Sequence, residues 1–256
     1  MWRSYWKWLQ FRRCDNCYVE ADIGDFTAQA GGLVGSTSSP VTINHSYWEG
    51  DYRVNSLSTI VGGIIGNLDT TTANVDVKDV YWSGSSKDTV PNTLGGIFGS
   101  IGSPKGSFTL ANAYWHGDGG ASAGIIGNVT NAANVSISNA YYRLDLPEGA
   151  AENAFGTAKT GDSFSAGEIA YLLDGGMPEG TVSQRAGTWT QNFGKGYPGL
   201  EKDKPVYMLT VSSDDNGTIG VKNRKFIVSE DNKALYFGIK GETAKKQMAL
   251  DSYSDE

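Results

Sequence analysis

The sequence predicts an all-β protein: a parallel β-solenoid (β-helix-like) of ~30-residue repeats, followed by a C-terminal helix and loop cap and a small β module. Three observations support this prediction. A glycine-rich phrase and an aromatic phrase return together four times along the chain. Apolar residues two positions apart precede each aromatic phrase, which is typical of strands. No helical pattern lies between these strands, which disfavours alternating strands and helices.

The two phrases occupy fixed columns of the repeat. GGLVG at 31–35 returns as GGIIG, GGIFG and AGIIG, with glycines that we expect to be structural: Gly32, Gly35, Gly63, Gly66, Gly96, Gly99, Gly124 and Gly127. SYWEG at 46–50 returns as VYWSG, AYWHG and AYYRL, and its tyrosines are separated by 34, 33 and 27 residues: Tyr47, Tyr81, Tyr114 and Tyr141. A fifth tyrosine, Tyr18, lies one period earlier. Because one repeat is too small to bury its own apolar face, successive repeats must stack. A β-propeller is the main alternative, but its blades usually need ~40 residues or more.

Further columns share the period. One is occupied by Val41, Val75, Phe108 and Val135, and another, two residues later, by Ile43, Val77, Leu110 and Ile137. A column of smaller residues precedes the tyrosines: Ser46, Val80, Ala113 and Ala140. We therefore expect like residues to lie over like residues in successive turns.

The repeat pattern stops after Tyr142. The stretch SFSAGEIAYLLDGG predicts one short helix, in which Ser165 and Glu168 have the spacing of a capping box. Gly175 and Gly176 provide the helix end. A helix and a loop here would cover strand edges left open at the end of a solenoid.

The character of the chain changes again from about Pro205. Asn216-Gly217 is a strong hairpin signal, and KFIVSEDNKALYFGIKG indicates a second hairpin. We expect five parts. They are an artefactual or wrongly assigned start, a solenoid, a capping segment with one short helix, a small hairpin module (complete or truncated) and a disordered tail: 1–13, 14–160, 161–204, 205–250 and 251–256.

The charge and composition of the chain argue against several classes of binding partner. The formal net charge is −7, which disfavours nucleic acid, whose binding depends on neutralising phosphates. It also disfavours anionic membrane surfaces, and no apolar run is long enough to span a membrane. Two cysteines are too few for a disulfide framework. We expect no cofactor.

GGLVG, GGIIG and GGIFG, each followed by Asn or Asp, a small residue and Tyr, resemble the GLUG-motif repeat of bacterial surface and secreted proteins. NCY at 16–18 is the commonest form of the tyrosine phrase in that family, and GEIAYLLDGG with WTQNFG and YPGLEKDKPVY is similar to the region that often follows such repeats. The likeness covers residues 14–205. It implies an extracellular, adhesin-like or stalk-like role without catalytic residues. The fourth repeat departs from the motif at Ala123 and Tyr142, as an end repeat would.

The start of the chain does not fit the repeat, although a glycine phrase is due there. Read one base out of frame with permitted codons, MWRSYWKW spells Cys-Gly-Gly-Leu-Ile-Gly-Asn-Gly. We therefore expect residues 1–13 to be a frame-shifted or wrongly assigned start of a longer gene, which its nucleotide sequence would test. The basic, aromatic start lacks the apolar stretch of a signal peptide, so we expect the export signal to lie upstream of this fragment.

The aromatic columns are the candidate ligand-binding residues: Tyr47, Tyr81, Tyr114, Tyr141, Trp48, Trp82 and Trp115. Adjacent residues of a strand point to opposite faces. If Ser46 faces the core, Trp48 does too, and Tyr47 faces out. An outward tyrosine ladder could bind a sugar chain or a protein, and the alternative is a purely structural stack. The variable linkers 49–61, 83–94 and 116–122 are the second place to expect binding.

The sequence gives weaker evidence for redox, catalytic or metal-binding residues. Cys14 and Cys17 have the spacing of a redox pair or half a zinc site, but Cys17 belongs to the column of small residues, so we expect a structural role. His45 lies in a column with Asp79, Asn112 and Asn139, which suits a turn or a side-chain ladder better than catalysis. The aspartates are scattered without a repeated pair, and HGDGG at 116–120 suits a turn better than calcium. We expect no catalytic and no metal-ligating residues.

These observations favour a non-enzymatic adhesin or scaffold domain, extracellular or at the cell surface. The expected partner is an extracellular glycan or a host or bacterial surface protein. Two alternatives stay open. One is a polysaccharide lyase or hydrolase on the same architecture, which needs converging carboxylates. The other is a passive stalk that only separates other domains.

Overall fold

The computed structural model of the chain describes residues 13–26, 28–54, 56–69, 74–88, 90–117, 124–143, 155–176, 187–192, 195–201, 206–210, 227–228 and 234–238. It divides into two compact units, residues 1–161 and 162–256. The first twelve residues of the predicted artefact 1–13, the Asn216-Gly217 turn and the tail at 251–256 lie outside the described residues.

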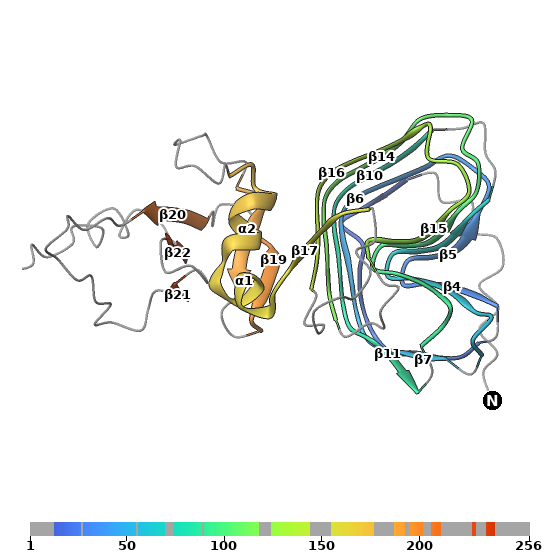
Figure 1. Cartoon of the computed structure of the whole chain (residues 1–256), viewed down its shortest axis with the longest axis horizontal. Helices are drawn as coiled ribbons and strands as arrows, with labels where there is room; N and C mark the ends of the chain where they lie inside the picture. The colour runs from blue at the N-terminus through green and yellow to red at the C-terminus, as the bar shows by residue number, and fades with distance from the viewer. Residues whose placement is uncertain are drawn as a thin grey trace, which may run out of the picture. The chain divides into compact units, whose positions relative to one another are not determined.

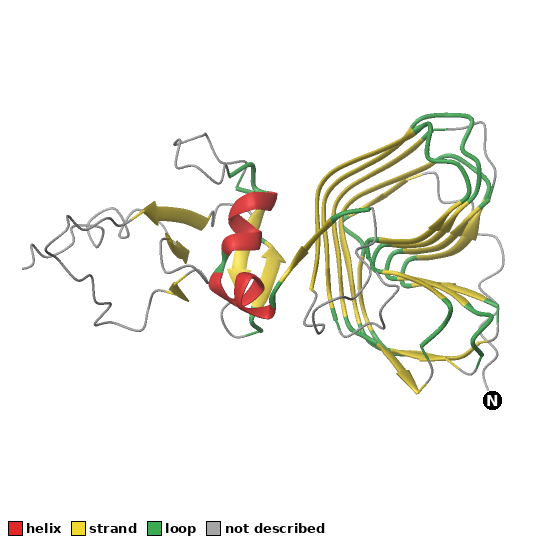
Figure 2. Ribbon diagram, in the orientation of Figure 1, coloured by secondary structure: helices red, strands yellow, loops and turns green. Residues whose placement is uncertain are grey.

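The first unit is a solenoid of about four turns built from parallel sheets (Figures 1 and 2). Its long sheet has the order β1-β6-β10-β14-β16-β17, and β2 also pairs with β6. The bounds of these strands are Arg13–Asp15 (β1), Tyr18–Glu20 (β2), Val41–Glu49 (β6), Val75–Ser83 (β10), Phe108–His116 (β14), Val135–Arg143 (β16) and Thr157–Lys159 (β17). Every pairing in this sheet is parallel, which confirms the predicted parallel β-solenoid.

Within the described residues, three shorter parallel sheets form the rest of the solenoid wall. The first is β3-β7-β11, with bounds Ile23–Phe26, Tyr52–Val54 and Ser86–Asp88. The second is β4-β8-β12, with bounds Gln29–Gly31, Ile60–Gly62 and Thr93–Gly95. The third is β5-β9-β13-β15, with bounds Val34–Thr37, Ile65–Leu68, Phe98–Ile101 and Ile126–Val129.

The register follows the columns expected from the sequence. Tyr81 lies opposite Tyr47 on one side and Tyr114 on the other, and the strand neighbours of Val75 are Val41 and Phe108. The pairing continues from Tyr114 to Tyr141. Successive turns therefore stack like residue over like residue.

The nine-residue strands of the long sheet bend at the column of His45. Five residues of this column have left-handed backbones, with φ between 47° and 56°: Asn16, His45, Asp79, Asn112 and Asn139. Residues three apart in a straight strand point to opposite faces. Across the bend, Ile43 and Ser46 are both buried, at 1% and 0% exposed. The turn predicted for this column is confirmed, and it lets both residues face the core.

In the core, the glycine-rich phrase of each turn contacts the aromatic phrase of the same turn across the interior. A Cβ atom added at Gly32, Gly63 or Gly96 would lie closer than 3.0 Å to the side chain of Trp48, Trp82 or Trp115 in the same turn. These glycines have φ values that any residue adopts, so the missing side chain is what matters. The tryptophan fills the space that its glycine leaves.

Two more glycine columns permit close approach of backbones. A Cβ atom at Gly62 would lie closer than 3.0 Å to backbone atoms of Ile65 and Gly99, and one at Gly66 would meet Ala30 and Gly35 as closely. The strands β8 and β9 therefore approach backbone to backbone at this corner. We did not expect the first glycine of each phrase to be so constrained: Gly31, Gly62 and Gly95.

In the stretch where one helix was predicted, the described residues form two: α1, Gly161–Ala166, and α2, Glu168–Leu173. Gly167 breaks the helix with φ 92° and serves as the N-cap of α2. The predicted capping box is therefore wrong, because Ser165 lies inside α1 and its hydroxyl donates to the carbonyl of Asp162. The predicted helix end at Gly175 is confirmed by φ 87° and a bond from its N–H to the carbonyl of Leu172.

Antiparallel strands complete this unit: β18 pairs with β19, and β22 lies between β20 and β21. Their bounds are Trp189–Asn192, Tyr197–Leu200, Val206–Thr210, Ile227–Val228 and Ala234–Gly238 for β18 to β22. The pairing of β21 with β22 agrees with the second predicted hairpin. Asp174 accepts hydrogen bonds from the backbone N–H groups of Gly187 and Thr188 at 2.9 and 2.8 Å, which joins the end of α2 to the start of β18. Among the described residues, no helix has the length and apolar character needed to span a bilayer.

We expect Gly66→Ala to destabilise the solenoid because the new methyl group would meet backbone atoms of Ala30 and Gly35. Overpacking of this kind lowers the free energy of unfolding by roughly 1–3 kcal/mol, measurable by urea denaturation. Gly35→Ala is the matched control, since the same column one turn earlier meets nothing closer than 3.9 Å. An equal loss in both variants would contradict the close approach.

Candidate functional site

The tryptophan column lies inside the solenoid. Trp48, Trp82 and Trp115 are 0–1% exposed, and successive ring centroids are 5.3 Å apart. Each indole Nε1 donates to a carbonyl of the preceding turn, at 2.8 to 3.0 Å: Ala21, Gly50 and Gly84. These side chains hold neighbouring turns together. Because they offer no surface to a ligand, the candidate site is reduced to the tyrosines.

The tyrosine column lies on the opposite side of the strands from the tryptophans. The ring centroids of Tyr18, Tyr47, Tyr81 and Tyr114 follow one another at 4.8, 4.7 and 4.9 Å. Exposure falls along this stack: Tyr18 is 48% exposed, Tyr47 is half-buried, and Tyr81 and Tyr114 are 3% and 0% exposed. Tyr141 is half-buried. Tyr81 and Tyr114 are therefore not part of an exposed ladder, as in the structural stack that was the alternative, and the rings of Tyr47 and Tyr114 stack on either side of Tyr81.

Two glutamates sit beside the exposed part of this stack. The hydroxyl of Tyr47 donates to Glu20 Oε1 at 2.9 Å, and that of Tyr81 donates to Glu49 Oε1 at 2.8 Å. Burial, followed by the hydrogen bond and charge of Glu20, raises the pKa of Tyr47. The phenol therefore stays protonated and remains a donor. We define the tyrosine–glutamate face as Tyr18, Tyr47, Glu20 and Glu49.

This face has the groups that sugar binding uses. A partly exposed tyrosine offers an apolar ring to the C–H face of a sugar. Glutamate oxygens accept hydrogen bonds from sugar hydroxyls, and each carboxylate has more acceptor positions than one tyrosine occupies. The sequence pattern identified the tyrosines but not the glutamates, although Glu20 lies two residues after Tyr18 and Glu49 lies two residues after Tyr47.

The column of His45 forms the side-chain ladder that the sequence left open as a possibility. Asn139 Nδ2 donates to Asn112 Oδ1 at 3.1 Å, and Asn112 Nδ2 donates to Asp79 Oδ1 at 2.9 Å. We name Asp79, Asn112 and Asn139 the amide ladder. The amide groups of Asn112 and Asn139 each donate to the turn before, which supports a structural role for the column.

Cys14 and Cys17 are joined by a disulfide bond. Cys14 pairs with Ile43 in the long sheet, and the backbone N–H of Cys17 donates to Ser46 Oγ at 3.0 Å. Both cysteines thus occupy inward columns on either side of the bend at Asn16. The disulfide replaces apolar packing at this bend, in line with the structural role expected for the pair.

The carboxylates of the first corner also connect turns. Asp22 Oδ1 accepts from the backbone N–H of Asp51, and Asp51 Oδ1 accepts from that of Ser85, at 2.9 and 2.8 Å. Lys87 Nζ lies 3.6 Å from Asp51 Oδ2. Among the described residues, no group of three or more His, Cys, Asp or Glu side chains is arranged to hold a metal ion. Part of the HGDGG stretch, residues 118–120, lies outside the described residues.

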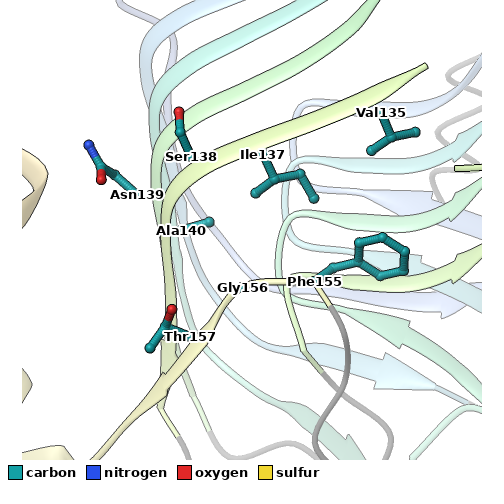
Figure 3. Close-up of a pocket in the computed structure, with 8 residues that line it drawn as sticks. All are labelled: Val135, Ile137, Ser138, Asn139, Ala140, Phe155, Gly156 and Thr157. Atoms are coloured by element: carbon teal, nitrogen blue, oxygen red, sulfur yellow. The ribbon is translucent and has the colours of Figure 1, made fainter. Parts of the chain in front are cut away.

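A cavity of about 270 Å³ lies beside the last full strand of the long sheet (Figure 3). Its lining comes from β16 and from the residues just before and within β17: Val135, Ile137, Ser138, Asn139, Ala140, Phe155, Gly156 and Thr157. No sequence motif pointed to this place. It arises where the stacking of turns is interrupted.

A scan against protein-family models finds no match for this chain, and searches of curated proteins and of solved structures find no significant match. The resemblance to GLUG-motif repeats therefore stays a prediction.

Asn112→Ala should lower the free energy of unfolding by about 2–4 kcal/mol. The substitution removes two hydrogen bonds of the amide ladder, each contributing ~1 kcal/mol, and alanine adopts this left-handed backbone at a cost of ~1–2 kcal/mol, which the short polar side chain of asparagine reduces. Asn112→Gly loses the same bonds without the backbone strain. We expect it to be more stable than the alanine variant by about 1 kcal/mol in urea denaturation. A glycine variant no better than the alanine variant would argue against strain at this column.

The disulfide predicts that the native protein, isolated under oxidising conditions, takes up no iodoacetamide and gains two labels after reduction, as read by intact mass. The double variant Cys14→Ser with Cys17→Ser should lose on the order of 1–2 kcal/mol of unfolding free energy, because the closed loop is short. Labelling of both thiols without reduction would contradict the bond.

Proposed function

We propose that this chain is a non-enzymatic extracellular scaffold of adhesin-like type, which binds a carbohydrate or protein partner through its tyrosine–glutamate face. The observation that carries the proposal is the pairing of partly exposed stacked tyrosines with glutamate oxygens: Tyr47 with Glu20, beside Tyr18 at 48% exposure. Rigid aromatic rings next to fixed acceptors are well suited to sugars and to polar protein surfaces.

The disulfide supports placement outside the cell. Disulfide bonds persist in secreted and surface proteins and are rare where thiols are kept reduced. Cys14 and Cys17 are bonded in a corner that the other turns build from apolar and small residues. An oxidising environment is therefore the one in which this corner keeps its cross-link.

The use of polar side chains supports a scaffold. The amide ladder, the Asp22 and Asp51 carboxylates and the tryptophan Nε1 groups all bond from one turn to the next. Such contacts give each turn the same relation to its neighbour and make a rigid support. The second candidate is a passive stalk, which is favoured by the burial of Tyr81 and Tyr114.

A glycan array probed with the full chain, followed by calorimetry on the best ligand, tests the proposal. We expect Tyr18→Ala and Glu20→Gln to weaken binding at least tenfold, because the first removes the stacking ring and the second the charged acceptor. Asp76→Asn is the matched control, since Asp76 is exposed in the long sheet on another part of its outer surface.

Absence of binding to glycans and to immobilised extracellular-matrix proteins would overturn the adhesin proposal and leave the stalk. Equal weakening in Asp76→Asn would show that binding depends on net charge and not on the tyrosine–glutamate face.

A further inference from the structure

The outer edge of β16 is only half paired. β10 and β14 are each flanked along their length by strands on both sides. β16 pairs with β14 over its length, whereas its other edge pairs with β17 only at Tyr141–Arg143. Among the residues that the structure describes, the first half of β16, residues 135–139, has no strand partner on that side. We name it the half-filled edge.

The side chains of this edge are left partly uncovered. In complete turns the same two columns are buried, at 0–3% exposed: Val41, Val75, Phe108, Ile43, Val77 and Leu110. In β16, Val135 and Ile137 are only partly buried and line the cavity together with Phe155. Figure 3 shows Val135, Ile137 and Phe155 directed into the same space, with Asn139 on the other side of the strand. The cavity is thus the space that a further strand would fill.

The amide ladder ends at the same edge. Asn139 donates its Nδ2 to Asn112, and within the described part of the chain its Oδ1 accepts no hydrogen bond. Asn139 is exposed. Asn112 Oδ1 accepts a hydrogen bond from the amide of Asn139, one turn further on. By the same geometry, Asn139 Oδ1 can accept from an amide placed one turn beyond β16.

We propose that the half-filled edge binds an extended segment of a partner protein as an added parallel strand of the pattern apolar-x-apolar-x-Asn. The chain's own columns set this pattern, because Val or Phe, then Val, Ile or Leu, then Asn, Asp or His occupy these positions in successive turns. Backbone hydrogen bonds supply affinity, and the cavity selects the two apolar side chains. The added strand would complete, beside β17, the turn that the chain fills only in part.

The added strand is a different site from the tyrosine–glutamate face and does not rest on the proposed function. A segment of five residues spans about 16 Å in extended form. The donor has to be uncharged at its first and third positions, since these side chains would pack on Val135, Ile137 and Phe155. A second copy of this chain pairing through the same edge is the competing occupant.

A peptide with the sequence SFTLANAY, copied from residues 107–114, tests the proposal in a fluorescence anisotropy titration against the full chain. We expect saturable binding, and at least tenfold weaker binding of the peptide SSTSANAY, which lacks both apolar side chains. Ile137→Ser in the protein should weaken binding at least fivefold. Val129→Ser is the matched control, because Val129 is also a partly buried edge residue that packs on the core but does not line the cavity.

Amide hydrogen exchange locates the bound peptide, since an added strand should slow exchange within residues 135–139. Thermal unfolding of both variants shows whether they keep the fold. No saturable binding up to millimolar peptide, or the same loss in Val129→Ser, would overturn the proposal. A concentration-dependent dimer in sedimentation equilibrium that Ile137→Ser abolishes would also overturn it, in favour of a second copy.

Discussion

The structure depends on the fit between an indole ring and a missing side chain. Trp48 and Trp82 each lie against the second glycine of their own turn, stack on the tryptophan of the next turn, and donate their Nε1 to the turn before. These three contacts act along three directions: across the core, forward and backward along the axis. No smaller aromatic residue would make all three, and no residue with a Cβ would leave the space. The two phrases of the sequence recur together because each is half of this contact.

The second constraint is the left-handed bend in every long strand. It turns two residues that would face opposite ways, such as Ile43 and Ser46, into neighbours on the inner side. The side chain at the bend can then reach a neighbouring turn, and Asn112 and Asn139 each donate to the turn before. A single backbone requirement thus selects the residue type, orients the core and builds the amide ladder.

The periodicity predicts most of the solenoid, because strand register, the bend column and the inward tryptophans all follow from residues repeating in phase. The sequence does not predict features that depend on contacts between residues far apart in the chain, or on the absence of a neighbouring strand. Tyr81 lies between the stacked rings of Tyr47 and Tyr114 from two other turns, and Glu20 becomes part of the candidate site only because the next turn brings Tyr47 over it. Ser165 and Glu168 satisfied a capping pattern, but the left-handed backbone at Gly167 placed a break between them. The half-filled edge has no motif, because it is defined by where pairing stops.

The corner loops of the solenoid vary in length from turn to turn, whereas its long strands do not. The long strands are nine residues in each of four turns, whereas the tyrosines are spaced by 34, 33 and 27 residues, so the corner loops absorb the difference in length. A turn makes the same contacts with whichever turn lies above or below it. Duplication or deletion of a whole repeat in the gene would therefore change the length of the molecule in steps of about 4.8 Å and leave the remaining turns as they are. The length of the solenoid can therefore change in equal steps through recombination between repeats, whereas point mutations leave it unchanged.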